Sequence, residues 1–228
     1  MINIKQYIEI LIEKLQSVFG SRLIYVGLQG SYNRGEATEN SDIDIMVIIN
    51  ELSLEDLKKY KEIILDIGNY EKSCGFICGK KELANWNPLE ICHLLNSTSD
   101  YYGKLKDFVP EYSKKDIADY IKISVGNLYH LLCHRYTHSA LENSFKGLPE
   151  IIKEVFFILQ NVYYLETGHF IQRKQDASSV LKEKDLKVWN KLIEIQHKND
   201  YNFDEAFSII LNWCTDIFER TSFLKNKS

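Results

Sequence analysis

The stretch Gly30-Ser31-Tyr32-Asn33-Arg34-Gly35, followed by Ser41-Asp42-Ile43-Asp44, decides how this chain is interpreted. It connects two apolar runs, residues 23–28 and 43–49, which have the composition of buried β-strands. A Gly-Ser turn after a strand leaves backbone N–H groups and a hydroxyl able to face a phosphate. Asp42 and Asp44 lie two residues apart on the second strand, so we expect both on one face of a sheet.

This Asp pair predicts a metal site. Neighbouring carboxylates repel each other unless a cation lies between them. Mg²⁺ takes one or two carboxylates together with phosphate oxygens of a substrate. We therefore expect Asp42 and Asp44 to be metal ligands, and Gly30 and Ser31 to hold the phosphates of a nucleoside triphosphate on magnesium.

The pattern G-S-x-x-R-G-x5-S-D-x-D resembles the signature of the nucleotidyltransferase superfamily, which includes the DNA polymerase β-like and the aminoglycoside nucleotidyltransferases. The resemblance implies an enzyme that transfers a nucleotidyl group, with Asp42 and Asp44 in catalytic, metal-binding roles. It also implies nucleotide-binding roles for Gly30, Ser31 and Ser41.

Arg34, inside the same motif, has two possible roles. It could reach a phosphate as a nucleotide-binding residue. It could instead pair with Glu36, Glu39 or an aspartate and fix the loop, and we favour this structural role slightly.

A third carboxylate is usual in this superfamily, on a neighbouring strand, as a metal ligand, a general base or both. Glu71, at the start of an expected third strand over residues 70–78, is the candidate catalytic residue, with Glu90 and Asp100 as alternatives. Gly75 inside that strand predicts a bulge or a close backbone approach. The strand has no acidic residue deeper in its core, which leaves open a site that binds without catalysing.

Composition limits the other possibilities. The chain has 228 residues, 45% hydrophobic and 12% aromatic, enough for a sizeable core. Its net charge of −4, without a basic tail, makes a nucleic-acid partner unlikely as an expectation. The five scattered cysteines predict free thiols and a reducing cytoplasm. We expect no signal peptide and no membrane segment.

The order of patterns along the chain predicts an α+β fold in two domains. Residues 1–108 are expected to form a nucleotidyltransferase domain, a small mixed sheet with flanking helices. Residues 109–228 are expected to form an all-α helical bundle, because every strong pattern there is helical. The expected helices cover 3–18, 53–66 and 88–96 in the first domain, and 114–140, 148–167, 173–182, 184–197 and 203–223 in the second.

A second resemblance lies in the predicted bundle. The segment from Tyr164 to Ala177, YLETGHFIQRKQDA, is similar to part of the helical domain of aminoglycoside adenylyltransferases of the streptomycin/spectinomycin type. In that family a Thr-Gly turn precedes a Lys-Asp-x-Ala helix start, and the lysine contacts the triphosphate. The resemblance implies a nucleotide-binding role for Lys174, with Arg173 as a substitute and one inserted residue here.

Three histidines, His130, His134 and His138, share one face of a predicted helix. Because no cysteine or carboxylate completes a ligand set, we expect core or interdomain histidines and not a metal site.

The sequence supports three hypotheses. The leading one is a magnesium-dependent enzyme that moves AMP or another NMP from an NTP to a hydroxyl of a small acceptor, such as an aminoglycoside-like compound. A protein acceptor, as for antitoxin-type relatives, is the alternative within the enzyme class. The third is a nucleotide-binding module without transfer activity. The sequence leaves the oligomeric state open.

Overall fold

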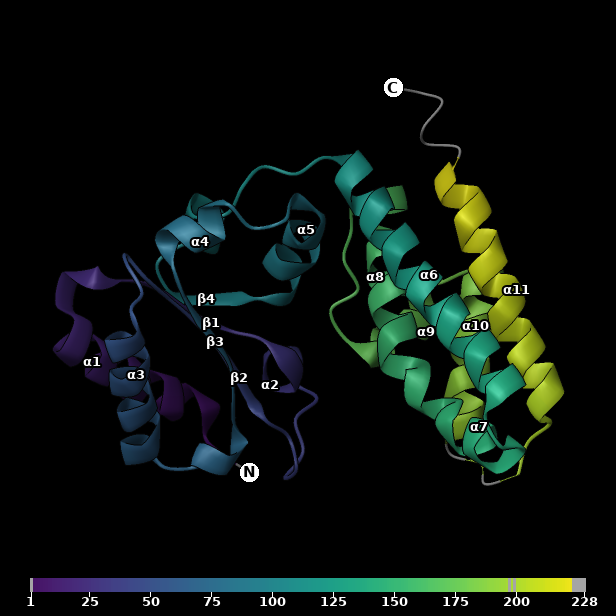
Figure 1. The fold of residues 1–228 in the computed structure, drawn as a ribbon, viewed down its shortest axis with the longest axis horizontal. Coiled ribbons are helices and arrows are strands. Elements are labelled where there is room, and N and C mark those ends of the chain that lie inside the picture. The colour runs from purple at the N-terminus through teal and green to yellow at the C-terminus, as the bar shows by residue number, and fades with distance from the viewer. Residues whose placement is uncertain (1, 197, 199, 223–228) are drawn as a thin grey trace. The chain divides into compact units, whose positions relative to one another are not determined.

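The computed structural model describes residues 2–196, 198 and 200–222, so the predicted helix ends at 197 and 223 lie outside the described residues. Contacts within the chain divide it into two compact units, Met1–Glu111 and Tyr112–Ser228 (Figure 1). We call them the first and the second unit and describe each by itself.

The first unit is built on a four-stranded sheet with the order β3-β2-β1-β4. Its strands are β1 (Leu23–Leu28), β2 (Ile43–Ile49), β3 (Ser73–Gly79) and β4 (Ser99–Tyr102). β2 runs parallel to β3, whereas β1 is antiparallel to both β2 and β4. The prediction of a small mixed sheet is therefore confirmed.

Helices cover both faces of this sheet (Figure 1). Ile43, Ile45 and Val47 of β2 pack in one core with α1 (Ile4–Phe19) and α3 (Leu54–Ile67). Met46 and Ile48 point to the opposite face, as strand alternation requires, and pack with residues of α4 (Lys80–Ala84) and α5 (Pro88–Ser97). This alternation places Asp44 on the face that α4 and α5 cover.

The helix α3 begins where the sequence predicted. Ser53 accepts a hydrogen bond from the Asp56 backbone N–H, and Asp56 accepts one from the Ser53 backbone N–H, which completes a capping box. The Asp56 carboxylate also binds Arg22, with 2.7 Å between Oδ1 and Nη2. The hydrogen bond from Arg22, followed by that from Ser53, holds the pKa of Asp56 well below its usual range.

All the regular elements among the described residues of the second unit are helices, which confirms the prediction of an all-α domain. Four long helices form its core: α6 (Lys114–His138), α8 (Ile152–Thr167), α10 (Glu183–Gln196) and α11 (Phe203–Ser222). Trp189 and Trp213 are fully buried among them. Two shorter helices, α7 (Leu141–Gly147) and α9 (Lys174–Val180), connect the long ones. No helix of the described residues combines the length and the apolar character needed to cross a membrane.

The structure differs from the sequence prediction in a few short elements and in one strand that begins later than expected. β4, α2 (Gly30–Arg34), α4 and α7 were not predicted, because none of these short segments shows a readable apolar pattern. The expected third strand also begins later, since residues 70–72 form a turn of 3₁₀ helix after Asn69, a non-glycine residue with a φ of 59°.

Candidate active site

Asp42 and Asp44 lie at the beginning of β2. Asp42 immediately precedes the strand and is exposed, and Asp44 is half-buried on the face opposite the α1–α3 core. Their side chains make no hydrogen bond or ion pair with any residue that the structure describes. Asp44 is therefore held in place by β2, and neither carboxylate has a cation partner among the residues that the structure describes.

Gly30 lies directly against the Asp44 carboxylate. A Cβ atom on Gly30 would lie 1.8 Å from Oδ2 of Asp44, and the φ of Gly30 is +66°, so both space and backbone conformation require glycine. The neighbouring Gln29 N–H donates to the Asp44 carbonyl at 2.8 Å. The Gly-Ser motif is thus brought into contact with the Asp pair.

The motif forms the short helix α2 and not an open turn. Its first turn leaves the backbone N–H groups of Gly30 and Ser31 without a partner inside the helix. Gly35 ends the helix in the left-handed conformation, and its N–H bonds back to the Ser31 and Tyr32 carbonyls. Backbone donors able to face an anion therefore lie beside Asp44, and their role in holding a triphosphate stays a prediction.

Arg34 and Ser41 both make contacts inside the loop. Nε of Arg34 lies 2.8 Å from Oε2 of Glu36, and the two side chains are 17% and 21% exposed. This ion pair is the loop-fixing contact anticipated for Arg34. The Ser41 hydroxyl accepts a hydrogen bond from the Thr38 N–H at 2.8 Å, so it closes the turn that leads into Asp42.

Glu71 lies outside β3. It is exposed, in the 3₁₀ turn that ends one residue before Ser73, the first residue paired with β2. Because β2 and β3 are parallel, Glu71 is at the same end of the sheet as the Asp pair. The expectation that Glu71 starts the third strand is wrong, because β3 begins two residues later, at Ser73. Glu71 therefore precedes the residues of β3 that pair with β2.

Cys74 is the residue that the register places beside Asp44. Its free thiol is exposed at the edge strand. Gly75 follows with a φ of +99°, and a Cβ there would lie 2.0 Å from the Ile45 carbonyl oxygen, so the predicted close backbone approach is confirmed. A period-2 alignment of residues 43–49 with 73–79 would have pointed to Cys74, but sequence reasoning missed it.

The end of α5 supports the motif, which the sequence did not predict. Asn33 donates through Nδ2 to the Ser97 carbonyl at 2.8 Å, and Gln29 donates through Nε2 to Thr98 Oγ1 at 2.9 Å. His93 of α5 lies near Arg34. Burial, followed by the charge of Arg34, lowers the pKa of His93 to about 4, so its imidazole is neutral at pH 7.

The alternatives to Glu71 have partners within the first unit. Asp100 accepts hydrogen bonds from the Tyr25 hydroxyl at 2.8 Å and from the Leu105 N–H at 3.2 Å, so it holds β4 to β1. Glu90 accepts a hydrogen bond from the Trp86 indole N–H at 2.6 Å.

Lys174 begins α9 in the second unit and is half-buried. It follows the turn that the sequence predicted, in which Gly168 ends α8 in the left-handed conformation. Arg173 is bound to Asp176 of its own helix, with Nε 2.8 Å from Oδ2. The basic turn is therefore formed, and its nucleotide-binding role stays a prediction.

The three histidines of α6 form a row, with ring centroids 6.2 Å apart for His130 and His134 and 5.2 Å apart for His134 and His138. Within the described residues, no group of three or more histidine, cysteine or acidic side chains is arranged to hold a metal ion.

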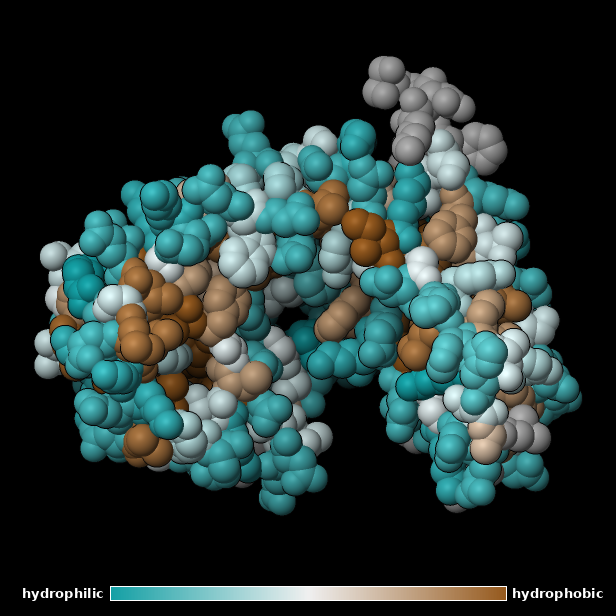
Figure 2. Space-filling model, viewed as in Figure 1, coloured by the Kyte–Doolittle hydropathy of each residue, from teal (hydrophilic) through white to brown (hydrophobic). Residues whose placement is uncertain are grey.

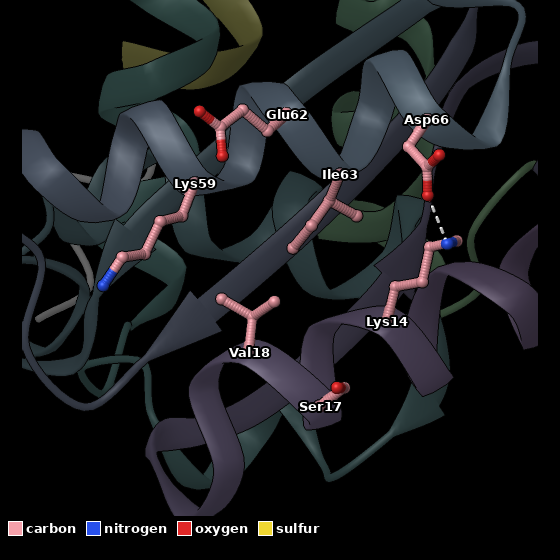
Figure 3. A pocket seen from close by; sticks show the side chains of 7 residues that line it. All are labelled: Lys14, Ser17, Val18, Lys59, Glu62, Ile63 and Asp66. Carbon is pink, nitrogen blue, oxygen red and sulfur yellow. Dashed lines mark hydrogen bonds and ion pairs between the residues drawn. The ribbon is translucent and has the colours of Figure 1, made fainter.

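A groove of about 350 Å³ lies between α1 and α3, on the other side of the sheet from Asp44 (Figure 3). An ion pair between Lys14 and Asp66 spans it. Apolar side chains are exposed around these helices (Figure 2). The groove is separated from the Asp pair by the sheet, so it is not part of the candidate site. It is lined by Lys14, Ser17, Val18, Lys59, Glu62, Ile63 and Asp66.

Comparison with known proteins finds a family that matches most of the first unit. Residues 4–83 match the family described as "Nucleotidyltransferase domain", a range that includes Gly30, Asp42, Asp44 and Cys74. The first unit therefore carries a nucleotidyltransferase domain.

The chain as a whole is similar to a solved structure. This is spectinomycin adenyltransferase AAD(9) from Enterococcus faecialis, crystallised with ATP and spectinomycin. The TM-score is 0.59 at 14% sequence identity, and the match covers 94% of this chain and 99% of that chain. The two proteins share a fold over both units. No curated protein matches the chain.

Proposed function

We propose that the protein is a magnesium-dependent nucleotidyltransferase that moves AMP from ATP to a hydroxyl of a small acceptor and releases pyrophosphate. The acceptor oxygen forms a bond to the α-phosphorus, and the bond from that phosphorus to the bridging oxygen of pyrophosphate breaks. The observation that carries the proposal is the Asp42–Asp44 pair, which contacts the Gly-Ser motif and has no cation partner in the described part of the chain.

The Asp pair fits a hard divalent cation. Asp42 and Asp44 offer carboxylate oxygens without competing partners, which is the ligand set that Mg²⁺ takes together with phosphate oxygens. Magnesium bound there would neutralise charge on the triphosphate.

The other residues of the site orient the reactants. The first N–H groups of α2, from Gly30 and Ser31, would donate to the terminal phosphates. Arg34, fixed by Glu36, and Ser41, which closes the loop, would keep this donor set in place and contribute nucleotide contacts. Lys174 would neutralise the leaving pyrophosphate. Positioning and electrostatics of this kind supply most of the rate in such transfers.

Glu71 is the proposed general base. Its exposed carboxylate lies at the same end of the sheet as the Asp pair, and it would take the proton of the acceptor hydroxyl.

The similarity to an adenyltransferase crystallised with ATP and spectinomycin supports ATP as the donor and a small aminocyclitol or aminoglycoside-like acceptor. The acidic balance of 32 acidic to 28 basic residues is compatible with a cationic acceptor. A second helical unit also favours a small acceptor over a protein partner. We place the enzyme in the cytoplasm, in keeping with its free thiols.

The test is pyrophosphate release by the full chain. Labelled ATP, GTP, CTP and UTP are each supplied with magnesium and a panel of aminocyclitols, aminoglycosides and other polyhydroxylated metabolites. The proposal predicts label transfer from ATP to at least one compound. Nucleotide binding without transfer to any compound would contradict it.

One observation favours a second candidate, a nucleotide-binding module without transfer activity. The β3 residue beside Asp44 is Cys74, where this superfamily usually has a carboxylate on the neighbouring strand. If the chain lacks activity for this reason, Cys74→Glu should produce pyrophosphate release where the wild type shows none. If Glu71 acts as base, Cys74→Glu should leave turnover unchanged or lower it.

A further inference from the structure

A stacked aromatic pair lies on the edge strand of the first unit. The rings of Phe76 on β3 and Trp86, between α4 and α5, have centroids 6.1 Å apart and an interplanar angle of 21°. Trp86 is 36% exposed, whereas the other two tryptophans, Trp189 and Trp213, are 1% and 2% exposed in the second unit. Of the three tryptophans, Trp86 is therefore the one whose indole a ligand can reach.

The pair lies on the same face of the sheet as the candidate site. Cys74 is paired with Asp44 and Phe76 with Met46, so all four side chains belong to one face. Phe76 is two residues from Cys74, a rise of about 7 Å along the strand. Phe76, on which Trp86 stacks, therefore lies one strand repeat beyond Cys74, the residue paired with Asp44.

Glu90 fixes the Trp86 ring and adds a charge beside it. The indole N–H donates to Oε2 of Glu90 at 2.6 Å. Glu90 lies in the first turn of α5, which Pro88 begins and the Asn87 side chain caps. Oε1 of Glu90 makes no hydrogen bond to any residue that the structure describes. This oxygen can accept a hydrogen bond from a molecule lying on the indole.

An aromatic ring next to a carboxylate favours a particular kind of ligand. The ring face takes the apolar face of a cyclic compound or attracts its ammonium groups. The carboxylate accepts hydrogen bonds from hydroxyl or ammonium groups and disfavours phosphates. We propose that Trp86 and Glu90 form the acceptor subsite of the first unit, for a ring compound that carries amino and hydroxyl groups. This inference rests on the proposed function, because it assigns the acceptor side of that reaction.

The test uses Trp86 as its own reporter. Spectinomycin, as an aminocyclitol probe, is titrated into the full chain in the presence of magnesium and a non-hydrolysable ATP analogue, and tryptophan fluorescence and its quenching by acrylamide are followed. We expect a saturable change that is absent from Trp86→Phe, since Trp189 and Trp213 are buried. 2-Deoxystreptamine serves as a second probe, and calorimetry gives the affinity independently of the reporter.

Glu90→Gln separates an acceptor contact from a structural one, because its amide oxygen can still accept from the Trp86 indole. We expect the dissociation constant for the probe to rise by about tenfold or more, with ATP affinity and melting temperature unchanged. The matched control is Glu13→Gln, an exposed glutamate of α1 on the other side of the sheet. Glu13→Gln should leave every value unchanged.

The outcomes separate the two proposals. Transfer to an aminocyclitol without any effect on Trp86 fluorescence, or with unchanged probe affinity in Glu90→Gln, overturns the subsite and leaves the enzyme standing. A Glu90-dependent fluorescence change without transfer supports the subsite and overturns the transferase. Neither binding nor transfer with any aminocyclitol overturns both.

Discussion

The carboxylates at the start of β2 differ sharply from those in the core of the second unit. Asp185 of α10 accepts hydrogen bonds from the Trp213 indole at 2.7 Å and from Arg220 at 2.9 Å and 3.0 Å. Burial acts to lower the pKa of Arg220, but the hydrogen bonds that Arg220 donates to Asp185 and Glu166 outweigh it and hold that pKa above its usual value. Asp42 and Asp44 have no such partners in the described part of the chain.

This difference separates a structural carboxylate from a functional one. Asp185 forms an ion pair with Arg220 of the same unit, so its partner is already present and the pair stabilises the fold. Asp42 and Asp44 have no cation partner in the described part of the chain, so under the proposed function their cation comes with the bound nucleotide. Asp185 of the second unit therefore serves stability, whereas the proposed function assigns the Asp pair of the first unit to a bound cation.

The largest effect is expected for the Asp pair. Asp44→Ala or Asp42→Ala should abolish magnesium-dependent pyrophosphate release, because each removes an oxygen ligand that no described neighbour replaces. The melting temperature should stay equal or rise slightly, since the repulsion disappears. The control is Asp66→Ala, which breaks the surface pair with Lys14. Wild-type release by either variant would contradict the assignment.

Glu71→Gln is expected to have the next largest effect. It preserves shape and removes the carboxylate charge, so turnover should fall by roughly 10²–10⁴-fold if Glu71 takes the acceptor proton. The affinity for ATP, measured by calorimetry, should change far less. Near-normal turnover would remove Glu71 from the reaction.

Asp185→Ala tests the other side of the comparison. It leaves Arg220 with Glu166 and Asp216, and it leaves the Trp213 indole without its acceptor. Unfolding in urea should show a loss of about 3 kcal/mol, within the range for breaking a buried pair. A loss as small as that of Asp44→Ala would mean that the two kinds of carboxylate do not differ in this way.

Lys174→Ala should weaken ATP binding or slow transfer by about 10- to 100-fold, the value of a hydrogen bond to a charged group. It should also raise the magnesium concentration needed for half-maximal activity. Lys174→Arg should recover part of the loss, because a planar guanidinium does not replace a compact ammonium. Lys187→Ala, at an exposed position of α10, provides the control. Equal behaviour of Lys174→Ala and this control would confine nucleotide binding to the first unit.

The smallest effect is a pH dependence of stability. The pKa of Asp56 is lowered in the folded chain, first by the hydrogen bond from Arg22. Its contribution is therefore complete at neutral pH and is lost as pH falls below the ordinary aspartate pKa of about 3.9 towards the lower folded value. Asp56→Asn should flatten the fall in melting temperature over that range. An unchanged fall in melting temperature with pH would argue against this contribution of Asp56 to stability.

The sequence predicted the segments that have a clear apolar pattern or a recognisable local motif. The apolar runs of β1 and β2, the capping box at Ser53 and the long helices of the second unit follow from periodicity and local chemistry. The close approach of Gly30 to the Asp44 side chain, which the missing Cβ of Gly30 allows, was not predicted and became visible only in the structure.

Features that depend on strand register or on contacts between residues far apart in the sequence were not predicted. Cys74 faces Asp44 only because of the β2–β3 register, and the bonds from Gln29 and Asn33 to the end of α5 join residues more than sixty positions apart. Glu71 was expected inside β3, but the left-handed Asn69 and the following 3₁₀ turn delay the strand to Ser73.

The central claim is that the Asp pair takes its cation together with a nucleotide. Calorimetric titration of a non-hydrolysable ATP analogue into the wild type and into Asp44→Asn, each with and without magnesium, tests it most directly. The account predicts magnesium-dependent binding to the wild type and weak, magnesium-independent binding to the variant. Equal affinity of both proteins for the analogue in magnesium would contradict it.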